Sequence, residues 1–488
     1  MSNPLDSLQP HLVWKHFAEI CGIPHPSKYE TALAEHIASW AAKKGLEVRR
    51  DAAGNVVVVV PATPGHESAP VIVLQGHLDM VPEANSDTPF DFLTQPIEVR
   101  VVGDYAYATG TTLGADNGIG VAAALAIAED AETVHGPLEL LFTIDEETGL
   151  TGAIQLDARL LTGRTLINLD TEEDGALYIG CAGGADTKST FTIGREDALP
   201  GTLPMRLSVR GLRGGHSGVD IHENRGNALK FVVRLLGDLR RAGMDFSIVS
   251  LAGGSKHNAI PREADAVLRI RPEEELRIRE IVEEKAATLK DEYGEIDPGQ
   301  RVEIEPVSDG AGAASVWLSF DADRILDALL ACPHGVLAMS RAVPGLVETS
   351  NNLAVVKTEE TTVWVQTSSR SSVMPSLKAT LDQVAAVFRL AGAVVETHDG
   401  YPGWKPNPAS PVLGTAKGVF LKLFGKEPLV RAIHAGLECG LIGEKFPGMD
   451  MVSMGPQIES PHSPDERVQI STVDRFYTLL KATLKELA

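Results

Sequence analysis

The stretch Val71-Ile-Val-Leu-Gln-Gly-His-Leu-Asp-Met80 decides the fold class of this chain. Its uninterrupted Val/Ile/Leu start is typical of a strand that is buried on both faces of a parallel sheet. Residues two apart on a strand point to the same face, so His77 and Asp79 share one side at the C-terminal end. Open α/β sheets bind their ligands at that end. The pair is therefore either a buried His–Asp pair or a metal ligand with a supporting carboxylate.

The overall composition excludes some partners. A chain of 488 residues exceeds a single hydrophobic core, so two or more domains are expected. The hydrophobic content of 43% is ordinary for a soluble globular protein. The formal charge of −22 argues against nucleic acid or a membrane surface as partner, because both require clustered Lys and Arg. The surplus acids are either a solvated surface or ligands for divalent cations.

Cysteine usage and the N-terminal residues predict a cytoplasmic protein. The four cysteines are scattered and form no Cys-x-x-Cys pattern, which argues against a thiolate zinc site or a redox dithiol. So few cysteines suit a reducing cytosol. Residues 1–17 are acidic and polar where a signal peptide would be basic and then apolar. No apolar stretch approaches the ~20 residues that span a bilayer.

Ligand-type residues follow several predicted strands. Strand 137–144 ends in Asp145-Glu146-Glu147, strand 165–169 ends at Asp170, and a loop after strand 449–454 carries His462. Asp116 lies in a glycine-rich turn before the alanine-rich helix 121–128, where an Asp alone is most often an N-cap. We expect these side chains to meet at one edge of the sheet. The candidates are His77, Asp79, Asp116, Glu146, Glu147, Asp170 and His462.

This set of residues suits two metal ions. Two imidazoles and three carboxylates are sufficient if one carboxylate bridges, and a site without thiolate suits Zn, Mn or Co. Two ions about 3.5–4 Å apart clamp a carbonyl group and activate water near neutral pH. Glu146 is then the general base, because consecutive residues at a strand end diverge and Glu147 can bind metal. Asp79 would orient His77, although Asp145 is an additional acid beside the base.

The middle of the chain has a different pattern and predicts an insert. Residues 188–396 alternate strands with amphipathic helices, with strands at 205–210, 246–251, 263–271, 301–307 and 362–368 and helices at 223–241, 272–291 and 376–391. We predict an α/β catalytic domain in two parts, residues 1–187 and 397–488, around an α+β domain at 188–396. The catalytic sheet is mixed, mainly parallel, and sandwiched by helices. Its first helical region, 10–46, breaks at a loop that ends in Ser27 as an N-cap.

Five motifs, in order, resemble the carnosinase/aminoacylase/carboxypeptidase G group of co-catalytic zinc peptidases over nearly the whole chain. They are His77-Leu-Asp79, Gly114-Ala-Asp116-Asn-Gly-Ile-Gly120, Glu146-Glu147, Asp170 and Pro461-His462-Ser463. Further motifs resemble the bacterial members of this group that hydrolyse aminoacyl-histidine dipeptides. These are Ile179–Gly184, Gly214-Gly-His-Ser-Gly218, Asn258-Ala-Ile-Pro-Arg262 and His434–Gly440.

The resemblance implies a role for each candidate. One ion would be bound by His77, Asp116 and Asp170, and the other by Asp116, Glu147 and His462. The ions would be zinc, with manganese or cobalt as alternatives. Glu146 would be the general base and Asp79 would fix His77. The insert would be a lid domain that forms a homodimer and closes over the site, with His216, Asn258, Arg370 and His434 as substrate contacts.

The residues themselves leave alternatives open for the substrate contacts. His216 lies between glycines and is equally a turn residue. Arg370, within Ser368-Ser-Arg-Ser-Ser372, is equally a surface arginine at a strand end. His434 and Glu438 either line the substrate pocket or brace it.

Three functions compete. The first is hydrolysis of unblocked dipeptides, with histidine favoured at the C-terminal position. The second is removal of the acyl group from N-acyl amino acids on the same scaffold. The third is a non-catalytic, metal-dependent assembly protein, which would have no need of a base such as Glu146.

Overall fold

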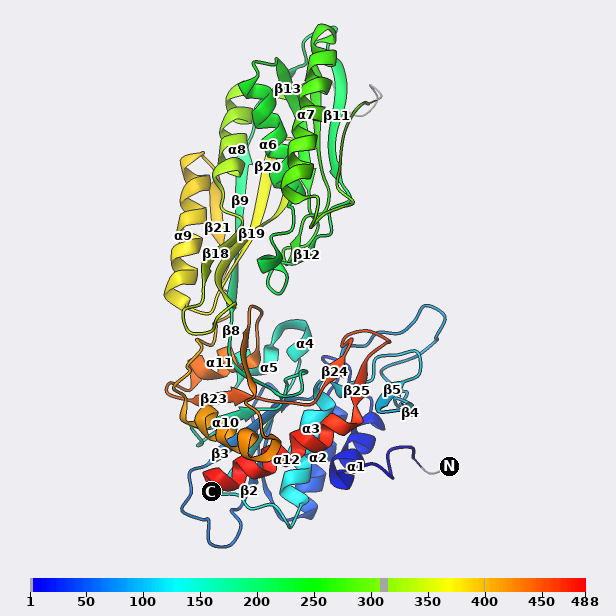
Figure 1. Cartoon of the computed structure of the whole chain (residues 1–488), viewed down its shortest axis with the longest axis vertical. Helices are drawn as coiled ribbons and strands as arrows, with labels where there is room; N and C mark the ends of the chain where they lie inside the picture. Colours follow the sequence, from blue (N-terminus) through cyan, green and yellow to red (C-terminus); the bar gives the residue numbers. More distant parts are fainter. Residues whose placement is uncertain (1–2, 308–314, 399) are drawn as a thin grey trace. The chain divides into compact units, whose positions relative to one another are not determined.

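The computed structural model describes residues 3–307, 315–398 and 400–488, which form two compact units (Figure 1). The first unit contains the chain up to Gly180 together with Trp404–Ala432 and Leu437–Ala488. The second unit contains Cys181–Gly403 and Ile433–Gly436. The second unit is therefore inserted into the first in the sequence. No helix of the described residues is long and apolar enough to cross a membrane.

Within the described residues, the first unit is built around an eight-stranded sheet with the order β1-β2-β6-β3-β7-β23-β8-β22. The four central strands, β6, β3, β7 and β23, run parallel to one another. The outer pairs β1–β2, β2–β6 and β23–β8 are antiparallel. The prediction of a mixed, mainly parallel sheet is confirmed. The strands are β1 (Glu47–Arg50), β2 (Val56–Val60), β3 (Ile72–His77), β6 (Leu138–Thr143), β7 (Thr165–Asn168), β8 (Ala176–Cys181), β22 (Leu429–Ile433) and β23 (Asp450–Ser453).

Helices cover both faces of this sheet, as strand β3 shows. Every residue of β3 is buried, and its side chains alternate between the two faces. A Cβ atom built on Gly76 would lie 3.6 Å from Val121 Cγ2 of helix α3 (Ala115–Glu129). On the opposite face, Gln75 Nε2 donates to Glu438 Oε2, at the start of helix α11 (Glu438–Lys445), at 2.6 Å. The predicted sandwich of sheet and helices is confirmed.

The remaining elements of the first unit surround this sandwich. Helix α1 packs against α3, and α10 packs against α12. A smaller four-stranded sheet has the order β24-β25-β5-β4. The elements are α1 (His11–Cys21), α2 (Thr31–Lys43), α4 (Glu146–Gly149), α5 (Thr151–Gln155), α10 (Pro411–Phe424), α12 (Ile470–Leu487), β4 (Val99–Val102), β5 (Tyr105–Ala108), β24 (Ile458–Glu459) and β25 (Arg467–Gln469).

The predicted N-cap at Ser27 is wrong. Helix α2 begins at Thr31, and Glu30 occupies the N-cap position. The Ser27 hydroxyl instead donates to Asp79 Oδ2 at 2.8 Å. The loop between α1 and α2 therefore supports the residue that follows β3.

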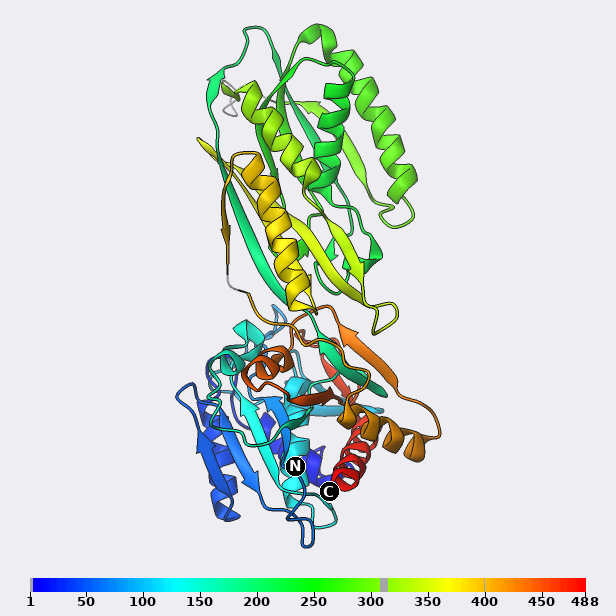
Figure 2. The same cartoon turned by 90° about the vertical axis from the view of Figure 1, so that its left-hand side faces the viewer.

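The second unit is an antiparallel sheet with helices packed against it (Figure 2). In the described residues the strand order is β16-β11-β15-β13-β19-β20-β9-β21, and β18 also pairs with β19. Helices α6, α7, α8 and α9 bury a core with the sheet that includes Phe191, Phe231 and Trp317. The main elements are β9 (Gly183–Thr192), β11 (Leu203–Arg210), α6 (Ala228–Arg241), β13 (Phe246–Gly253), β15 (Ala264–Ile270), α7 (Glu275–Tyr293), β16 (Arg301–Pro306), α8 (Ser319–Ala331), β18 (Gly335–Met339), β19 (Val347–Thr358), β20 (Thr362–Ser371), α9 (Met374–Leu390) and β21 (Val394–Thr397).

Two short strand pairs also belong to the second unit. Strand β10 (Arg195–Asp197) pairs with β17 (Ser315–Trp317), and β12 (Gly215–His216) pairs with β14 (Ala259–Ile260). Within β12–β14, His216 is opposite Ala259, so the motifs around His216 and Asn258 are neighbours. The α+β character predicted for the insert is confirmed.

Candidate metal centre

The carboxyl ends of three parallel strands carry predicted ligands, and a helix and a loop supply the other two. Strand β3 ends at His77 and β7 is followed by Asp170. Strand β6 leads through Asp145, with φ of 48°, into the short helix α4 that begins with Glu146 and Glu147. His462 lies in the segment after β24, and Asp116 lies in the first turn of α3.

Asp116 lies between two imidazoles. Its Oδ1 is 3.1 Å from His77 Nε2, and its Oδ2 is 3.1 Å from His462 Nε2. The carboxylate is almost completely buried, with a relative exposure of 8%. Because each oxygen faces a different histidine, Asp116 has the geometry of a ligand that bridges two ions.

Two ligand groups share Asp116. His77, Asp116 and Asp170 form one group, and Asp116, Glu147 and His462 form the other, with the candidate ligand atoms of each group within 4.8 Å of one another. His77 Nε2 is 3.4 Å from Asp170 Oδ1, and His462 Nε2 is 3.0 Å from Glu147 Oε2. The structure therefore brings together all five residues that were predicted to bind metal.

The donors of these groups fit divalent ions. Glu147 Oε1 is buried and accepts no hydrogen bond within the described residues, and the buried Asp170 Oδ1 has only the 3.4 Å contact with His77. A buried carboxylate oxygen without a partner is costly unless a cation neutralises it. Imidazole and carboxylate donors without thiolate suit zinc, manganese or cobalt. The residues present thus fit the predicted pair of ions.

The pKa values of the acidic and histidine side chains at this site also indicate that it requires cations. Burial raises the pKa of Asp170 to about 7, and the nearby Asp116 adds to this rise. Burial likewise raises the pKa of Glu172 to about 8, with Asp116 and Asp170 contributing. Hydrogen bonds to Asp116 and Glu147 raise the pKa of His462 to about 11. Acids packed this closely are stable as anions only when positive charge lies among them.

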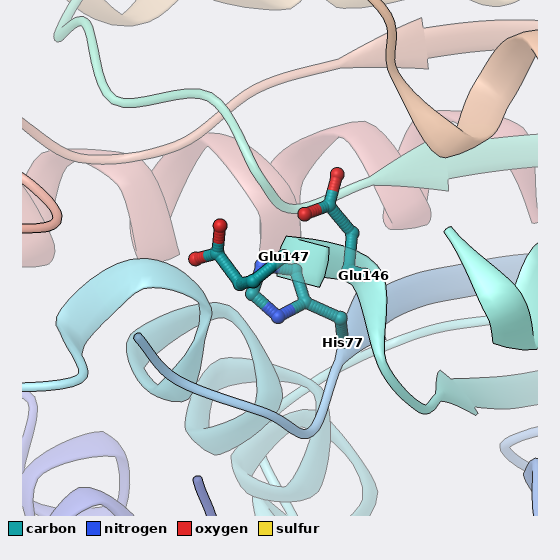
Figure 3. A group of neighbouring side chains, drawn as sticks. All are labelled: His77, Glu146 and Glu147. Carbon is teal, nitrogen blue, oxygen red and sulfur yellow. The ribbon is translucent and has the colours of Figure 1, made fainter. Parts of the chain in front are cut away.

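Glu146 and Glu147 begin the same short helix but have different surroundings. In Figure 3 the two side chains leave α4 in different directions, beside the His77 ring. Glu147 contacts His462, as described above, and Glu146 forms with His77 and Glu147 a third group of candidate ligand atoms that lie within 4.8 Å of one another. Burial raises the pKa of Glu146 well above its usual range.

The additional acid, Asp145, has a structural position. Its Oδ1 accepts the Thr148 hydroxyl at 2.5 Å, and its Oδ2 accepts the Thr151 hydroxyl. These bonds tie α4 to α5 and engage both oxygens of the Asp145 carboxylate. Asp145, the acid that could be confused with Glu146 in the sequence, thus has a threonine hydroxyl on each carboxylate oxygen.

Asp79 supports both His77 and α4. Its Oδ1 is 3.3 Å from His77 Nδ1, which also lies 3.0 Å from the Asp79 carbonyl oxygen. The same carboxylate accepts the backbone N–H groups of Glu146 at 2.9 Å and Glu147 at 3.1 Å. Burial alone would raise the pKa of Asp79, but the His77 and backbone hydrogen bonds lower it to about 2. Asp79 therefore positions the general-base candidate as well as His77.

Glu438 braces the sheet below this site. Its Oε2 accepts the Thr143 hydroxyl of β6 at 2.7 Å in addition to the bond from Gln75 on β3. Gln75 Oε1 in turn accepts Asn168 Nδ2 of β7 at 2.6 Å. This buried network joins the three strands that carry Glu146, His77 and Asp170. Of the two alternatives for Glu438, these hydrogen bonds favour bracing of the sheet.

Sequence reasoning missed two side chains that contact the Asp116 turn, Glu466 and Asn117. Glu466 accepts backbone N–H groups from Leu113 to Asp116, across some 350 residues of sequence. Asn117 bonds to the Leu169 carbonyl group, next to Asp170. No local sequence pattern could indicate contacts between residues so far apart in the chain. Asn117 entered the sequence analysis only as a member of the glycine-rich motif around Asp116.

The four predicted substrate contacts lie together within the second unit. A Cβ atom built on Gly218 would lie 2.2 Å from the His434 carbonyl oxygen, 3.0 Å from His216 Cε1 and 3.2 Å from Arg370 Nε. The neighbouring Ser217 N–H donates to the Asn258 carbonyl oxygen at 2.8 Å. Gly218 is thus at the centre of this substrate cluster, which we define as His216, Asn258, Arg370 and His434.

The hydrogen bonds of His216 fix its tautomer. Its Nδ1 accepts the backbone N–H groups of Gly218 at 3.2 Å and Val219 at 3.0 Å. A nitrogen that accepts two N–H groups carries no proton, so the proton of the neutral ring is on Nε2. Burial and the Arg370 cation lower the pKa of His216, which keeps the ring neutral. His216 therefore presents one N–H donor, Nε2.

Arg370 and His434 are buried polar residues. Arg370 is 6% exposed and donates from Nη1 to the Tyr401 hydroxyl at 2.7 Å. Its Nε has no acceptor among the described residues. The interpretation of Arg370 as a surface arginine is therefore wrong. His434 Nε2 is 2.7 Å from the Ser350 hydroxyl, and burial with the nearby Arg370 lowers the pKa of His434 to about 3.

Comparison with known proteins identifies the family. The model of peptidase family M20/M25/M40 matches residues 73–486. This chain belongs to the M20 peptidase family. It is thus a hydrolase that acts on peptide bonds, and the family predicted from the motifs is confirmed.

Relatives of this M20 peptidase extend over its whole length. It is 42% identical over 483 residues to the cytosol non-specific dipeptidase of Escherichia coli K12, covering 99% of both chains. Its structure matches the aminoacylhistidine dipeptidase of Vibrio alginolyticus with a TM-score of 0.93 and 44% identity, covering 99% of this chain and 98% of that one. The aminopeptidase PepT of Bacillus cereus shares the fold at 16% identity, with a TM-score of 0.58 and coverage of 98% and 99%.

Proposed function

We propose that this M20 peptidase is a metal-dependent dipeptidase that hydrolyses unblocked dipeptides and favours histidine at the C-terminal position. The position of Asp116 carries this proposal, because its two oxygens each lie 3.1 Å from a different histidine. The full-length similarity to a non-specific dipeptidase and an aminoacylhistidine dipeptidase supports the substrate class.

Two divalent ions would be held at this centre. His77, Asp116 and Asp170 would bind one ion, and Asp116, Glu147 and His462 the other. We propose zinc, with manganese or cobalt as alternatives, from the donor set. Bound ions would polarise the scissile carbonyl group and acidify the attacking water.

Glu146 would move the proton of the reaction. Of the three consecutive acids, Asp145 is bound to two threonine hydroxyls and Glu147 faces His462, which leaves Glu146 for proton transfer. Its carboxylate would accept a proton from the attacking water and then donate it to the leaving amine. The two backbone bonds from α4 to Asp79 hold Glu146 for this role.

The substrate cluster of the second unit would bind the peptide. His216 Nε2–H would donate to the carbonyl oxygen as negative charge develops on it. Arg370, whose Nε has no acceptor among the described residues, and Asn258 would bind the substrate's carboxylate end. His434, held by Ser350 and close to Arg370, would line the same part of the cluster.

The resemblance to the family also supports a domain assignment and an assembly. We propose a catalytic domain of residues 1–187 and 397–488 and a lid domain of residues 188–396 through which the chain forms a homodimer. Light scattering after gel filtration should give a mass of twice 52.0 kDa. The name of the Escherichia coli relative, a cytosol dipeptidase, supports a cytoplasmic location.

Removal of metal is expected to abolish the activity reversibly. Dialysis against a chelator should lower the rate of Gly-His hydrolysis by more than ~100-fold, because the water loses its activation. Addition of Zn²⁺ or Mn²⁺ should restore it. The measurement is histidine release, with β-alanyl-histidine and N-acetyl-histidine as parallel substrates. Faster cleavage of N-acetyl-histidine would favour a deacylase, and no cleavage of any dipeptide by metal-loaded protein would exclude the proposed function.

Gly218→Ala is expected to damage substrate binding without changing the metal centre. The new Cβ atom would lie 2.2 Å from a backbone oxygen, so His216, Arg370 and His434 must shift. We expect kcat/KM to fall by about 100-fold, as for a displacement of reacting groups by about 1 Å. Metal content should stay at the wild-type level.

Gly414→Ala in helix α10 is the matched control. A Cβ atom there meets nothing within 4 Å. This change should leave kcat/KM unaltered and raise helix stability slightly. Equal kinetics for Gly218→Ala and the wild type would remove the substrate cluster from the reaction.

A further inference from the structure

The turn that carries Asp116 is not held by regular helical hydrogen bonding. Helix α3 begins after Gly114, which has φ of 72°. Asp116 (φ −83°, ψ 108°) and Asn117 (φ −104°, ψ 23°) then depart from helical geometry. The N–H groups of a first helical turn have no partner within the helix and must find one elsewhere. The position of the bridging ligand therefore depends on side chains from other segments.

Glu466, which follows His462 in the sequence, accepts hydrogen bonds from the backbone N–H groups of this turn. Its Oε2 accepts the N–H groups of Leu113 at 2.8 Å and Gly114 at 3.1 Å. Its Oε1 accepts those of Ala115 at 2.8 Å and Asp116 at 3.2 Å. The Glu466 side chain is 2% exposed, and its own N–H donates to the Ser463 carbonyl group, next to His462. One carboxylate thus ties the His462 loop to the turn that holds Asp116.

Asn117 makes the equivalent connection on the Asp170 side. Its Nδ2 donates at 2.8 Å to the carbonyl group of Leu169, the residue before Asp170. Two glycines make room for this side chain, because a Cβ atom on Gly76 or Gly120 would lie 2.2 or 2.7 Å from Asn117 Oδ1. Asn117 is 2% exposed. The side chain adjacent to Asp116 thus fixes the distance from the turn to the other ligand segment.

We propose that Glu466 and Asn117 are positioning residues that set the two metal sites separately. Glu466 fixes Asp116 relative to His462, and Asn117 fixes Asp116 relative to Asp170. A bridging carboxylate must place each of its two oxygens correctly against ligands from a different loop. The structure supplies one hydrogen-bonded side chain for each loop, Glu466 for the His462 loop and Asn117 for the Asp170 loop. This inference rests on the metal centre of the proposed function.

A purely structural role makes a different prediction. A carboxylate at a helix N-terminus is a common cap that stabilises the fold. If Glu466 were only a cap, its loss would lower the stability of the metal-free protein and leave the relative affinities of the two sites unchanged. The affinity of each site for metal alone is therefore the discriminating measurement.

The test compares Co²⁺ binding by the wild type and by the variants Glu466→Gln and Asn117→Ala. Binding is measured by calorimetry and by the visible absorption of the bound ion. Gln keeps the shape of Glu466 but directs an NH₂ group at backbone donors. We expect the wild type to bind two ions, and each variant to retain one tight site while the other weakens by about 10- to 100-fold, as is usual when a supporting residue of a metal ligand is lost. Glu459→Gln, on the neighbouring strand β24, is the control and should bind like the wild type.

Double variants assign the weakened site. Glu466→Gln combined with His462→Ala should bind Co²⁺ like His462→Ala alone, whereas combined with Asp170→Ala it should leave no tight site. Asn117→Ala combined with Asp170→Ala should bind Co²⁺ like Asp170→Ala alone, whereas combined with His462→Ala it should leave no tight site. Additive losses in all combinations, or equal weakening of both sites in each variant, would overturn the inference.

The experiment also distinguishes a failure of the proposed metal centre from a failure of the positioning roles. A wild-type protein that binds no Co²⁺ would contradict the metal centre itself, whereas a wild type with two tight sites and unaltered variants would contradict only the positioning roles. Urea unfolding of the metal-free proteins checks the fold. If Glu466→Gln does not fold, Glu466→Asp replaces it, because Asp keeps both oxygens but is one methylene shorter and should weaken the same site.

Discussion

Glu146→Gln is expected to lower kcat by about 10²- to 10⁴-fold while the protein still binds two ions per chain. This range is typical for the loss of a general base, since Gln cannot accept the proton of the attacking water. Glu146 is in neither of the two ligand groups that share Asp116, and its backbone remains tied to Asp79. The measurement is steady-state hydrolysis of Gly-His alongside metal analysis of the same preparation. KM should change much less than kcat.

Two neighbouring substitutions serve as controls for Glu146→Gln. Glu147→Gln should lose metal, because Glu147 is 3.0 Å from His462 and supplies one of the three donors of its group. Asp145→Asn should mainly reduce stability, because Asp145 accepts two threonine hydroxyls that join α4 to α5. If Glu146→Gln lost an ion while Glu147→Gln retained both, the roles of base and ligand would have to be exchanged.

The sequence was sufficient to predict the parallel strands of the first unit and to indicate its candidate ligands, for a physical reason. Strands β3 and β6 are buried along their whole length and are mostly apolar, and before their last position the polar residues within them are Gln75 and Glu139. The first polar residues after such a run are then at the carboxyl edge, where parallel strands collect them. His77, Glu147 and Asp170 were found by this rule, and the structure brings them together.

The same rule fails in the second unit. Strand β19 contains Thr349, Ser350, Asn351 and Asn352, all buried, and was not predicted. Its polar side chains find partners across the sheet, as when the Ser369 hydroxyl donates to Asn351 Oδ1 at 2.8 Å. An apolar pattern cannot reveal a strand whose burial is compensated by hydrogen bonds. Ser350 holds His434 in the substrate cluster, so the omission concealed part of the candidate site.

Contacts between distant segments were also beyond the sequence. Ser27 has the residue type of an N-cap, and local propensity could not indicate that its hydroxyl donates to Asp79. Glu466 is an ordinary acid after a Ser-Pro-Asp turn, yet it accepts four backbone N–H groups from the Asp116 turn. In each case the function of the side chain depends on a partner that only the folded chain brings near.

Asp116→Ala is expected to empty both metal sites, whereas His462→Ala should empty only one. Asp116 faces His77 with Oδ1 and His462 with Oδ2, so its loss removes one of the three donors of each group. His462 belongs to one group, and the site of His77, Asp116 and Asp170 remains complete without it. Metal analysis after gel filtration should give about two ions per chain for the wild type, about one for His462→Ala and about none for Asp116→Ala.

The activities should follow these metal contents. Both variants should lose dipeptide hydrolysis by more than ~100-fold, since two ions act together on the carbonyl group and the water. Excess Zn²⁺ should partly restore His462→Ala, whose remaining ligands Asp116 and Glu147 still face the vacated position, but not Asp116→Ala. Arg467→Ala is the matched control for His462→Ala, because Arg467 lies in the same segment and pairs with Glu459, which belongs to neither ligand group. An Asp116→Ala protein that kept one tightly bound ion would show that Asp116 serves a single site and that the two ions are held independently.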